Sequence, residues 1–171
     1  MTSIYLRSMD ERDTMDIIRW RNSEQVRKYF IYQDDFTVEG HTYWLQEVVQ
    51  KGKACQMMIC KEDTNKAIGS VFIRDIDLHH KKGEFGIFIG EDAERGSGIG
   101  SAATRMILEH GFSQLGLNRI YLRVLADNAR AIRSYEKAGF QKEGYLRDDV
   151  FLNGEFKDIV WMAALEKDVR K

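Results

Sequence analysis

Residues 83–100 of the chain read GEFGIFIGEDAERGSGIG, and this stretch decides which fold the sequence predicts. Phe85, Ile87 and Ile89 recur at every second position, which is typical of one face of an extended strand. Three glycines follow within five residues, and apolar residues then recur at helical spacing over residues 98–115. The stretch therefore predicts a strand, a glycine-rich turn and a helix in direct succession.

On either side of this stretch, period-two alternation predicts further strands and 3.6-residue spacing predicts helices. The expected strands cover residues 4–7, 55–60, 67–75, 83–89, 119–125, 145–152 and 157–165. The expected helical segments begin at Asp10, near residue 24, at residue 36, at residue 98 and at residue 128. We therefore predict a single domain over residues 1–171 of the mixed α/β class: a mixed, mostly antiparallel sheet of six to seven strands, with helices on both faces.

Composition narrows the class of protein. The 171 residues carry 26 Lys and Arg against 27 Asp and Glu, a net charge of -1, which argues against a nucleic-acid partner. No apolar run approaches the ~20 residues that span a bilayer, and residues 1–10 lack a signal-peptide pattern. We expect a cytoplasmic globular protein without a membrane or nucleic-acid partner.

The glycine-rich turn, with Arg95 at its start, has the chemistry of a phosphate site. Closely spaced glycines let the main chain approach a ligand, and the N-terminus of the following helix adds partial positive charge. The Walker A string does not occur, and the dinucleotide pattern Gly-x-Gly-x-x-Gly fails because position 101 is Ser. We therefore expect this turn to bind a phosphate or pyrophosphate group of another kind.

Two strings together resemble a known family. Residues 95–100 match Arg/Gln-x-x-Gly-x-Gly/Ala, and residues 128–140 read NARAIRSYEKAGF. In this order and at this spacing they resemble the acetyl-CoA-binding signature of the GNAT N-acetyltransferase superfamily. The resemblance covers nearly the whole chain and is strongest over residues 84–144. It implies acetyl-CoA as the co-substrate and transfer of the acetyl group to an amine.

The resemblance also implies roles for single residues. The CoA pyrophosphate would be held by the turn and its main-chain N–H groups, that is by Arg95, Gly96, Ser97, Gly98, Ile99, Gly100 and Ser101. Asn128 would orient the pantetheine arm, and as an N-cap it would equally begin the helix that follows.

Two side chains are candidates for the chemistry. Tyr135 matches the tyrosine that protonates the departing thiolate in many family members, although a tyrosine on a short helix is also a common core residue. Glu84 lies on the strand that leads to the turn and is the candidate base, acting through water; the alternative is an ordinary solvent-facing carboxylate. Neither the turn nor the Tyr135 helix contains a cysteine, so we expect direct transfer.

The acceptor stays open at this level. Arg21 and Asn22 lie in a segment similar to that of N-acetyltransferases acting on nucleotide-linked amino sugars, where they would meet phosphate or hydroxyl groups; the alternative is a basic, solvated helix face. Residues 77–85 and 151–158 instead resemble bacterial spermidine and ribosomal-protein N-terminal acetyltransferases. A polyamine would need clustered carboxylates, for which the chain offers Asp34, Asp35 and Glu39, or Asp148 and Asp149.

The predicted function is therefore an acetyl-CoA-dependent N-acetyltransferase acting on a primary amine of a small molecule, such as a polyamine or amino sugar, or on a peptide N-terminus. The alternative is a non-catalytic module that binds acetyl-CoA as a sensor. His79 and His80 have no third ligand at metal spacing, so no metal is expected. The sequence leaves open a homodimer or a higher homo-oligomer, formed for example through an exposed sheet edge.

Overall fold

The computed structural model describes residues 3–170, whose strands form one seven-stranded sheet. The strands are β1 Ile4–Ser8, β2 Cys55–Lys61, β3 Ala67–Asp77, β4 Lys82–Ile89, β5 Arg119–Leu125, β6 Gln141–Leu152 and β7 Glu155–Leu165. The α-helices are α1 Thr14–Asn22, α2 Glu24–Arg27, α3 Val38–Trp44, α4 Ile99–Ser113, α5 Ala129–Ala138 and α6 Glu166–Val169. No helix within residues 3–170 is long and apolar enough to cross a membrane.

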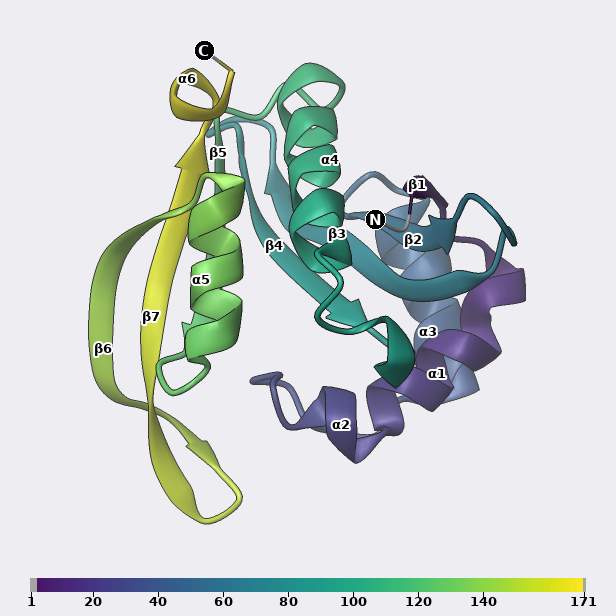
Figure 1. Ribbon diagram of the computed structural model, residues 1–171, viewed down its shortest axis with the longest axis horizontal. Coiled ribbons are helices and arrows are strands. Elements are labelled where there is room, and N and C mark those ends of the chain that lie inside the picture. The colour runs from purple at the N-terminus through teal and green to yellow at the C-terminus, as the bar shows by residue number, and fades with distance from the viewer. Residues whose placement is uncertain (1–2, 171) are drawn as a thin grey trace.

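The strands follow the order β1-β2-β3-β4-β5-β7-β6, and all neighbours are antiparallel except β4 and β5. The parallel pairing of β4 with β5 covers only Lys82–Glu84 opposite Arg119–Tyr121. Beyond Glu84 the two strands separate, and Figure 1 shows β4 diverging from the β6–β7 hairpin along its length. The sheet is therefore open at its centre, with unpaired backbone groups on both sides of the opening.

Helices cover both faces of the sheet, as predicted. Figure 1 shows α4 and α5 in front of the sheet and α3 behind it. The face under α4 and α5 buries a core that includes Phe85, Ile107 and Ile132. The opposite face buries a second core, which includes Trp20 from α1 and Phe88 from β4. The alternation of residues along β4 thus sends neighbouring side chains into two separate cores.

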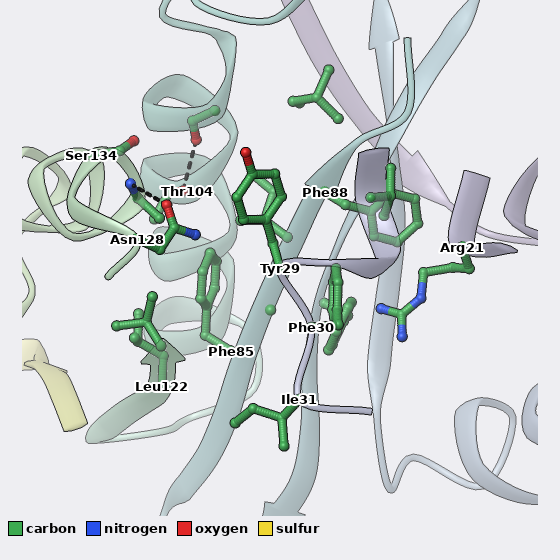
Figure 2. Close-up of a pocket in the computed structure, with 18 of the residues that line it drawn as sticks. Arg21, Tyr29, Phe30, Ile31, Phe85, Phe88, Thr104, Leu122, Asn128 and Ser134 are labelled. Carbon is green, nitrogen blue, oxygen red and sulfur yellow. Dashed lines mark hydrogen bonds between the residues drawn. The ribbon is translucent and has the colours of Figure 1, made fainter. Parts of the chain in front are cut away.

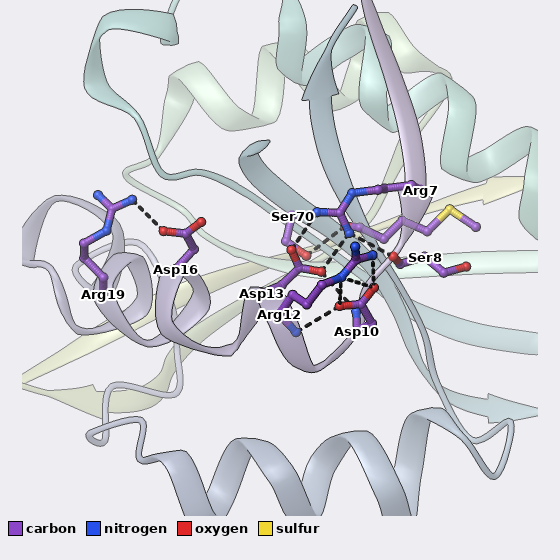
Figure 3. A network of polar contacts seen from close by, with 9 residues as sticks. Arg7, Ser8, Asp10, Arg12, Asp13, Asp16, Arg19 and Ser70 are labelled. Carbon is purple, nitrogen blue, oxygen red and sulfur yellow. Dashed lines mark hydrogen bonds and ion pairs between the residues drawn. The ribbon is translucent and has the colours of Figure 1, made fainter. Parts of the chain in front are cut away.

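A buried ion pair fixes the start of α1 against β1. Arg7 donates from both Nη atoms to the carboxylate of Asp13, at 2.6 and 2.8 Å, and the side chain of Asp13 is 5% exposed. Asp13 also accepts from the backbone N–H of Asp10 at 3.0 Å, and Asp10 accepts from Arg12 N–H, which completes a capping box. Figure 3 shows these contacts between β1 and the helical segment. They hold in place the helix that carries Arg21 and Asn22.

Two elements differ from the sequence prediction. β6 begins at Gln141 rather than at residue 145, because its first residues are polar and exposed on an edge strand and so show no apolar alternation. The helical segment expected over residues 36–52 consists of α3 followed by a π-helical turn, η2 Leu45–Val49. Short 3₁₀ turns, η1 Glu11–Asp13 and η3 Asp92–Glu94, precede α1 and the glycine-rich turn.

Candidate active site

A cavity of about 900 Å³ occupies the opening between β4 and β5. Phe85 and Ile87 line it from β4, and Leu122 and Val124 line it from β5. It extends to the glycine-rich turn on one side of the sheet and to α1 and α3 on the other. Figure 2 shows this cavity with side chains from β4, β5, the N-terminal helical region and the loop at Tyr29–Ile31. One cavity therefore extends from the glycine-rich turn to the side of the sheet that α1 and α3 cover.

The glycine-rich turn presents main-chain donors to this cavity. Gly96 and Gly98 have φ of +87° and +84°, a backbone conformation that favours glycine, and Gly98 is the N-cap of α4. The first α4 bond runs from Ala102 N to Gly98 O at 3.1 Å, so the preceding N–H groups have no acceptor inside the helix. Such a helix end favours an anion.

Gly100 gives a separate indication of a ligand. Its φ is not positive, and a Cβ built on it would meet nothing within 4 Å. Neither the backbone conformation nor the packing of this chain therefore requires glycine at position 100. A ligand lying against the first turn of α4 would require it, and the extended pyrophosphate and pantetheine of CoA would do so.

Arg95 reaches the cavity, but its guanidinium is largely engaged. Nε and Nη2 donate to Ile89 O at 3.2 and 3.0 Å, and Nη1 pairs with Asp92 at 3.0 Å. Arg95 thus fastens the turn to the end of β4. The sequence analysis missed a second cation, Arg130 of α5. Its Nη2 lies 3.3 Å from the position that a Cβ built on Gly96 would take. Its position inside the 128–140 motif was a signal for it.

Six of the eight predicted CoA-binding residues line the cavity: Arg95, Gly96, Gly98, Gly100, Ser101 and Asn128. Ser97 and Ile99 are not among its lining residues. The Ser97 hydroxyl donates to Glu94 O at 2.8 Å, and the Ile99 side chain is buried in the core. Only their main-chain N–H groups remain for the predicted role.

Asn128 is the N-cap of α5, as predicted. Its Oδ1 accepts from Ala131 N–H at 3.2 Å. Figure 2 shows this bond and shows the amide nitrogen of Asn128 on the cavity side. The cap occupies the oxygen and leaves the nitrogen available to a ligand, so both roles are compatible.

Tyr135 lines the cavity from α5, opposite the glycine-rich turn of α4. Its half-buried ring packs edge-on against Phe85 and Phe140, with centroids 5.6 and 5.9 Å apart. Burial raises the pKa of Tyr135 to about 12, so the phenol stays protonated at neutral pH. Its hydroxyl makes no hydrogen bond to any residue within 3–170, which leaves it free for a ligand.

Glu84 is buried, so its interpretation as a solvent-facing carboxylate is wrong. The residue is 6% exposed and lies at the last paired position of β4 and β5, where the cavity begins. Arg123 Nε donates to Oε1 at 2.8 Å, and Arg74 Nη2 donates to Oε2 at 3.2 Å. The sequence analysis missed both arginines. Arg74 lies directly opposite Glu84 in the antiparallel pairing of β3 and β4, whereas Arg123 reaches it only because β5 pairs beside β4, which leaves no mark in the sequence.

Arg21 and Asn22 have different surroundings. The interpretation of Arg21 as part of a solvated helix face is wrong, because the residue is 6% exposed and lines the cavity. Asn22 is not a lining residue. Its Nδ2 donates to Phe36 O at 2.9 Å, and its Oδ1 accepts from Phe36 N–H at 2.7 Å and from Arg27 at 3.2 Å. Asn22 thus holds the segment after α2 in place.

The carboxylates considered for a polyamine do not gather in this cavity. Asp35 lines it but pairs with Arg27, while Asp34 and Glu39 are not lining residues. Asp148 and Asp149 line a separate, open depression on the β6–β7 hairpin.

Residues 3–141 match the family described as Acetyltransferase (GNAT) domain. The chain belongs to the GNAT acetyltransferase family. Membership confirms the predicted N-acetyltransferase class, its co-substrate acetyl-CoA and the predicted fold.

Relatives of this GNAT protein include enzymes with a named acceptor. It is 26% identical over 168 residues to the spermidine N(1)-acetyltransferase of Vibrio cholerae, covering 96% of this chain and 94% of the relative. It is 30% identical over 175 residues to the probable N-acetyltransferase YjcK of Bacillus subtilis, covering 97% and 96%. The crystal structure of spermidine N-acetyltransferase from V. cholerae in complex with CoA and spermine superposes with a TM-score of 0.91 at 24% identity, covering 98% of each chain.

Proposed function

We propose that residues 1–171 form one acetyltransferase domain that transfers the acetyl group of acetyl-CoA directly to a primary amine. The observation that carries the proposal is the convergence of three features on one cavity: the glycine-rich turn, the Tyr135 hydroxyl and the Glu84 carboxylate. Acetyl-CoA supplies a thioester, whose carbonyl carbon is attacked by an amine nitrogen.

The donor half of the cavity binds the CoA portion. The N–H groups at the start of α4 and the cation of Arg130 hold the pyrophosphate, while Arg95 keeps the turn in position. The unpaired backbone edges of β4 and β5 offer hydrogen bonds to the amide groups of the pantetheine arm. Asn128 contributes its free amide nitrogen beside that arm.

The acceptor amine must lose a proton. At pH 7 the neutral form costs about 1.4 kcal/mol for an amine of pKa near 8 and about 4.6 kcal/mol for one near 10.4. Glu84 accepts this proton through water, since its carboxylate lies where β4 and β5 separate. Arg74 and Arg123 fix the position of that carboxylate.

The departing sulfur gains a proton as the new C–N bond forms and the C–S bond breaks. Tyr135 donates it, because its phenol is protonated, has no competing partner within the described residues and lines the same cavity. The nitrogen loses its second proton to the phenolate through water as the amide forms, and Glu84 releases the first proton to solvent as CoA leaves.

Release of free thiol from acetyl-CoA tests the proposal across a panel of amines that includes spermidine, an amino sugar, an amino acid and an N-terminal peptide. Spermidine belongs in the panel because relatives of the chain are named for it. We expect turnover with at least one amine, with mass spectrometry showing one added acetyl group. Tight CoA binding without turnover on any amine would instead indicate the non-catalytic sensor.

A further inference from the structure

Arg21 is a buried cation whose N–H groups are mostly unused. Within the described part of the chain its buried Nε has no hydrogen-bond acceptor, and the one hydrogen bond of its side chain there, from Nη2 to Tyr32 O, is long at 3.4 Å. The guanidinium carbon lies 3.5 Å from the ring centroid of Phe30 and 4.5 Å from that of Phe36. Aromatic faces attract the positive charge but accept no directed hydrogen bonds from the five N–H groups. Figure 2 shows the guanidinium directed into the cavity beside Phe30.

Among residues 3–170, no carboxylate pairs with Arg21. Two further cations, Arg74 and Arg27, act on it and lower its pKa, and the neighbour that acts in the opposite direction is Tyr32. Burial, followed by Arg74, lowers the pKa of Arg21 to about 9. The carboxylates of the cavity are already used: Glu84 pairs with Arg74 and Arg123, Asp35 with Arg27, and Glu94 with Lys61.

A second buried polar group that lines the same cavity also has no hydrogen-bond partner within residues 3–170 for one of its nitrogen atoms. His41 is 3% exposed and lines the cavity. Its Nδ1 lies 3.0 Å from Thr14 Oγ1, while its buried Nε2 has no partner among the residues that the structure describes. Buried polar groups that lack partners in the protein are commonly satisfied by a ligand. Two such groups line the cavity on the α1–α3 side of the sheet, which indicates a polar ligand group there.

We infer that the acceptor is an amine that also carries a carboxylate or phosphate group, and that Arg21 binds this anion. The inference rests on the proposed acetyl transfer and names the substrate class of its acceptor half. An anion opposite Arg21 would supply the missing acceptors and offset the charges of Arg21 and Arg74. A polyamine would instead bring further positive charge to these two cations, which is unfavourable beside the buried guanidinium of Arg21.

Matched pairs of amines test the inference by thiol release. One pair is 4-aminobutyrate and butylamine, and the other is glucosamine 6-phosphate and glucosamine; spermidine is the polycationic comparison. We expect the anionic member of one pair to have a kcat/KM higher by about tenfold or more, the effect of one charge-assisted contact. The pair that shows the difference tells whether the anion is a carboxylate or a phosphate.

Variants of α1 then assign the preference to one side chain. Arg21→Met should raise the KM of the anionic member by about tenfold while kcat changes little, and Arg21→Lys should keep part of the preference. Arg19→Met is the matched control, because Arg19 lies on the same helix but is 58% exposed and pairs with Asp16 and Glu91. Unchanged CoA affinity in all three variants shows that they are folded.

Three outcomes would overturn the inference. In the first, the unmodified protein uses spermidine or the uncharged members as well as the anionic ones. In the second, Arg21→Met keeps the full preference for the anionic member. In the third, no amine releases thiol at all, and this outcome alone also removes the proposed transferase function.

Discussion

Replacing Tyr135 by Phe removes one oxygen atom from the proposed active site and little else. The ring keeps its edge-on contacts with Phe85 and Phe140, at 5.6 and 5.9 Å between centroids. Because the hydroxyl makes no hydrogen bond to another residue within 3–170, its loss breaks no contact in this part of the chain. We expect the free energy of unfolding to change by less than about 0.5 kcal/mol.

The effect on turnover follows from the proton that the hydroxyl donates. The pKa of Tyr135 is raised to about 12, and a thiol has a pKa of about 8.5. Complete transfer from phenol to thiolate is therefore unfavourable by about 3.5 units, or ~5 kcal/mol. General acids contribute about 10²- to 10⁴-fold, and such an unfavourable donor belongs at the lower end. We expect kcat to fall about 100-fold, equivalent to ~2.7 kcal/mol.

The measurement is thiol release at saturating acetyl-CoA and acceptor, together with the dissociation constant of CoA from calorimetry. CoA affinity should stay within about twofold, since the glycine-rich turn is unchanged. Tyr145→Phe is the matched control, because Tyr145 is exposed and its hydroxyl bonds to Asp158 on the β6–β7 hairpin. A kcat of Tyr135→Phe within twofold of the unmodified protein would refute the assignment of Tyr135 as the acid.

Three further predictions follow from the same cavity. An ordinary tyrosine would be half ionised at about pH 10, whereas the pKa of Tyr135 is about 12. Since Tyr135 acts while protonated, its ionisation should not lower kcat between pH 8 and 10. A pH–rate profile checks this, because any decline that Tyr135 causes would be absent from the profile of Tyr135→Phe. Glu84→Gln removes the anion between two partly exposed arginines, so it should lower the free energy of unfolding by about 2 kcal/mol, measured in urea. It should also reduce kcat at least about tenfold, because the proposed base is lost. Unchanged values in both assays would contradict the proposed role of Glu84 as the base. Gly100→Ala should stabilise the ligand-free protein by about 0.5–1 kcal/mol and yet weaken CoA binding. Stronger CoA binding by this variant would contradict the inference that the ligand lies directly against Gly100.

Much of the donor half of the site was predictable from local sequence. A strand, three closely spaced glycines and a helix form a continuous segment, so their order alone places N–H donors at the start of α4. The N-cap role of Asn128 was equally local, because the cap accepts from a residue three positions later. The prediction missed Arg130, whose proximity to Gly96 depends on how α5 packs beside α4.

The acceptor half was not predictable in the same way. Alternation along β4 shows that Glu84 lies on the opposite face from Phe85, but it does not show which strand pairs beside it. Arg123 is 39 positions away and reaches Glu84 only through the parallel pairing of β4 and β5. Burial of Glu84 is a consequence of that pairing, and so is the opening from which the cavity arises.

The sequence by itself determined the class of the fold, the glycine-rich turn between a strand and a helix, and the family to which the chain belongs, because short motifs and local periodicity mark each of them. The tertiary structure alone decided which charges are buried and which remain without a partner. Arg21 lies in a basic segment whose composition is typical of a solvated helix face, and only the packing of Phe30 and Phe36 around it buries its charge. The electrostatic energy of a charge depends on its surroundings in space rather than along the chain. For that reason the proposed acceptor contacts follow from the folded cavity, whereas residues 83–100 already predict the proposed phosphate contacts.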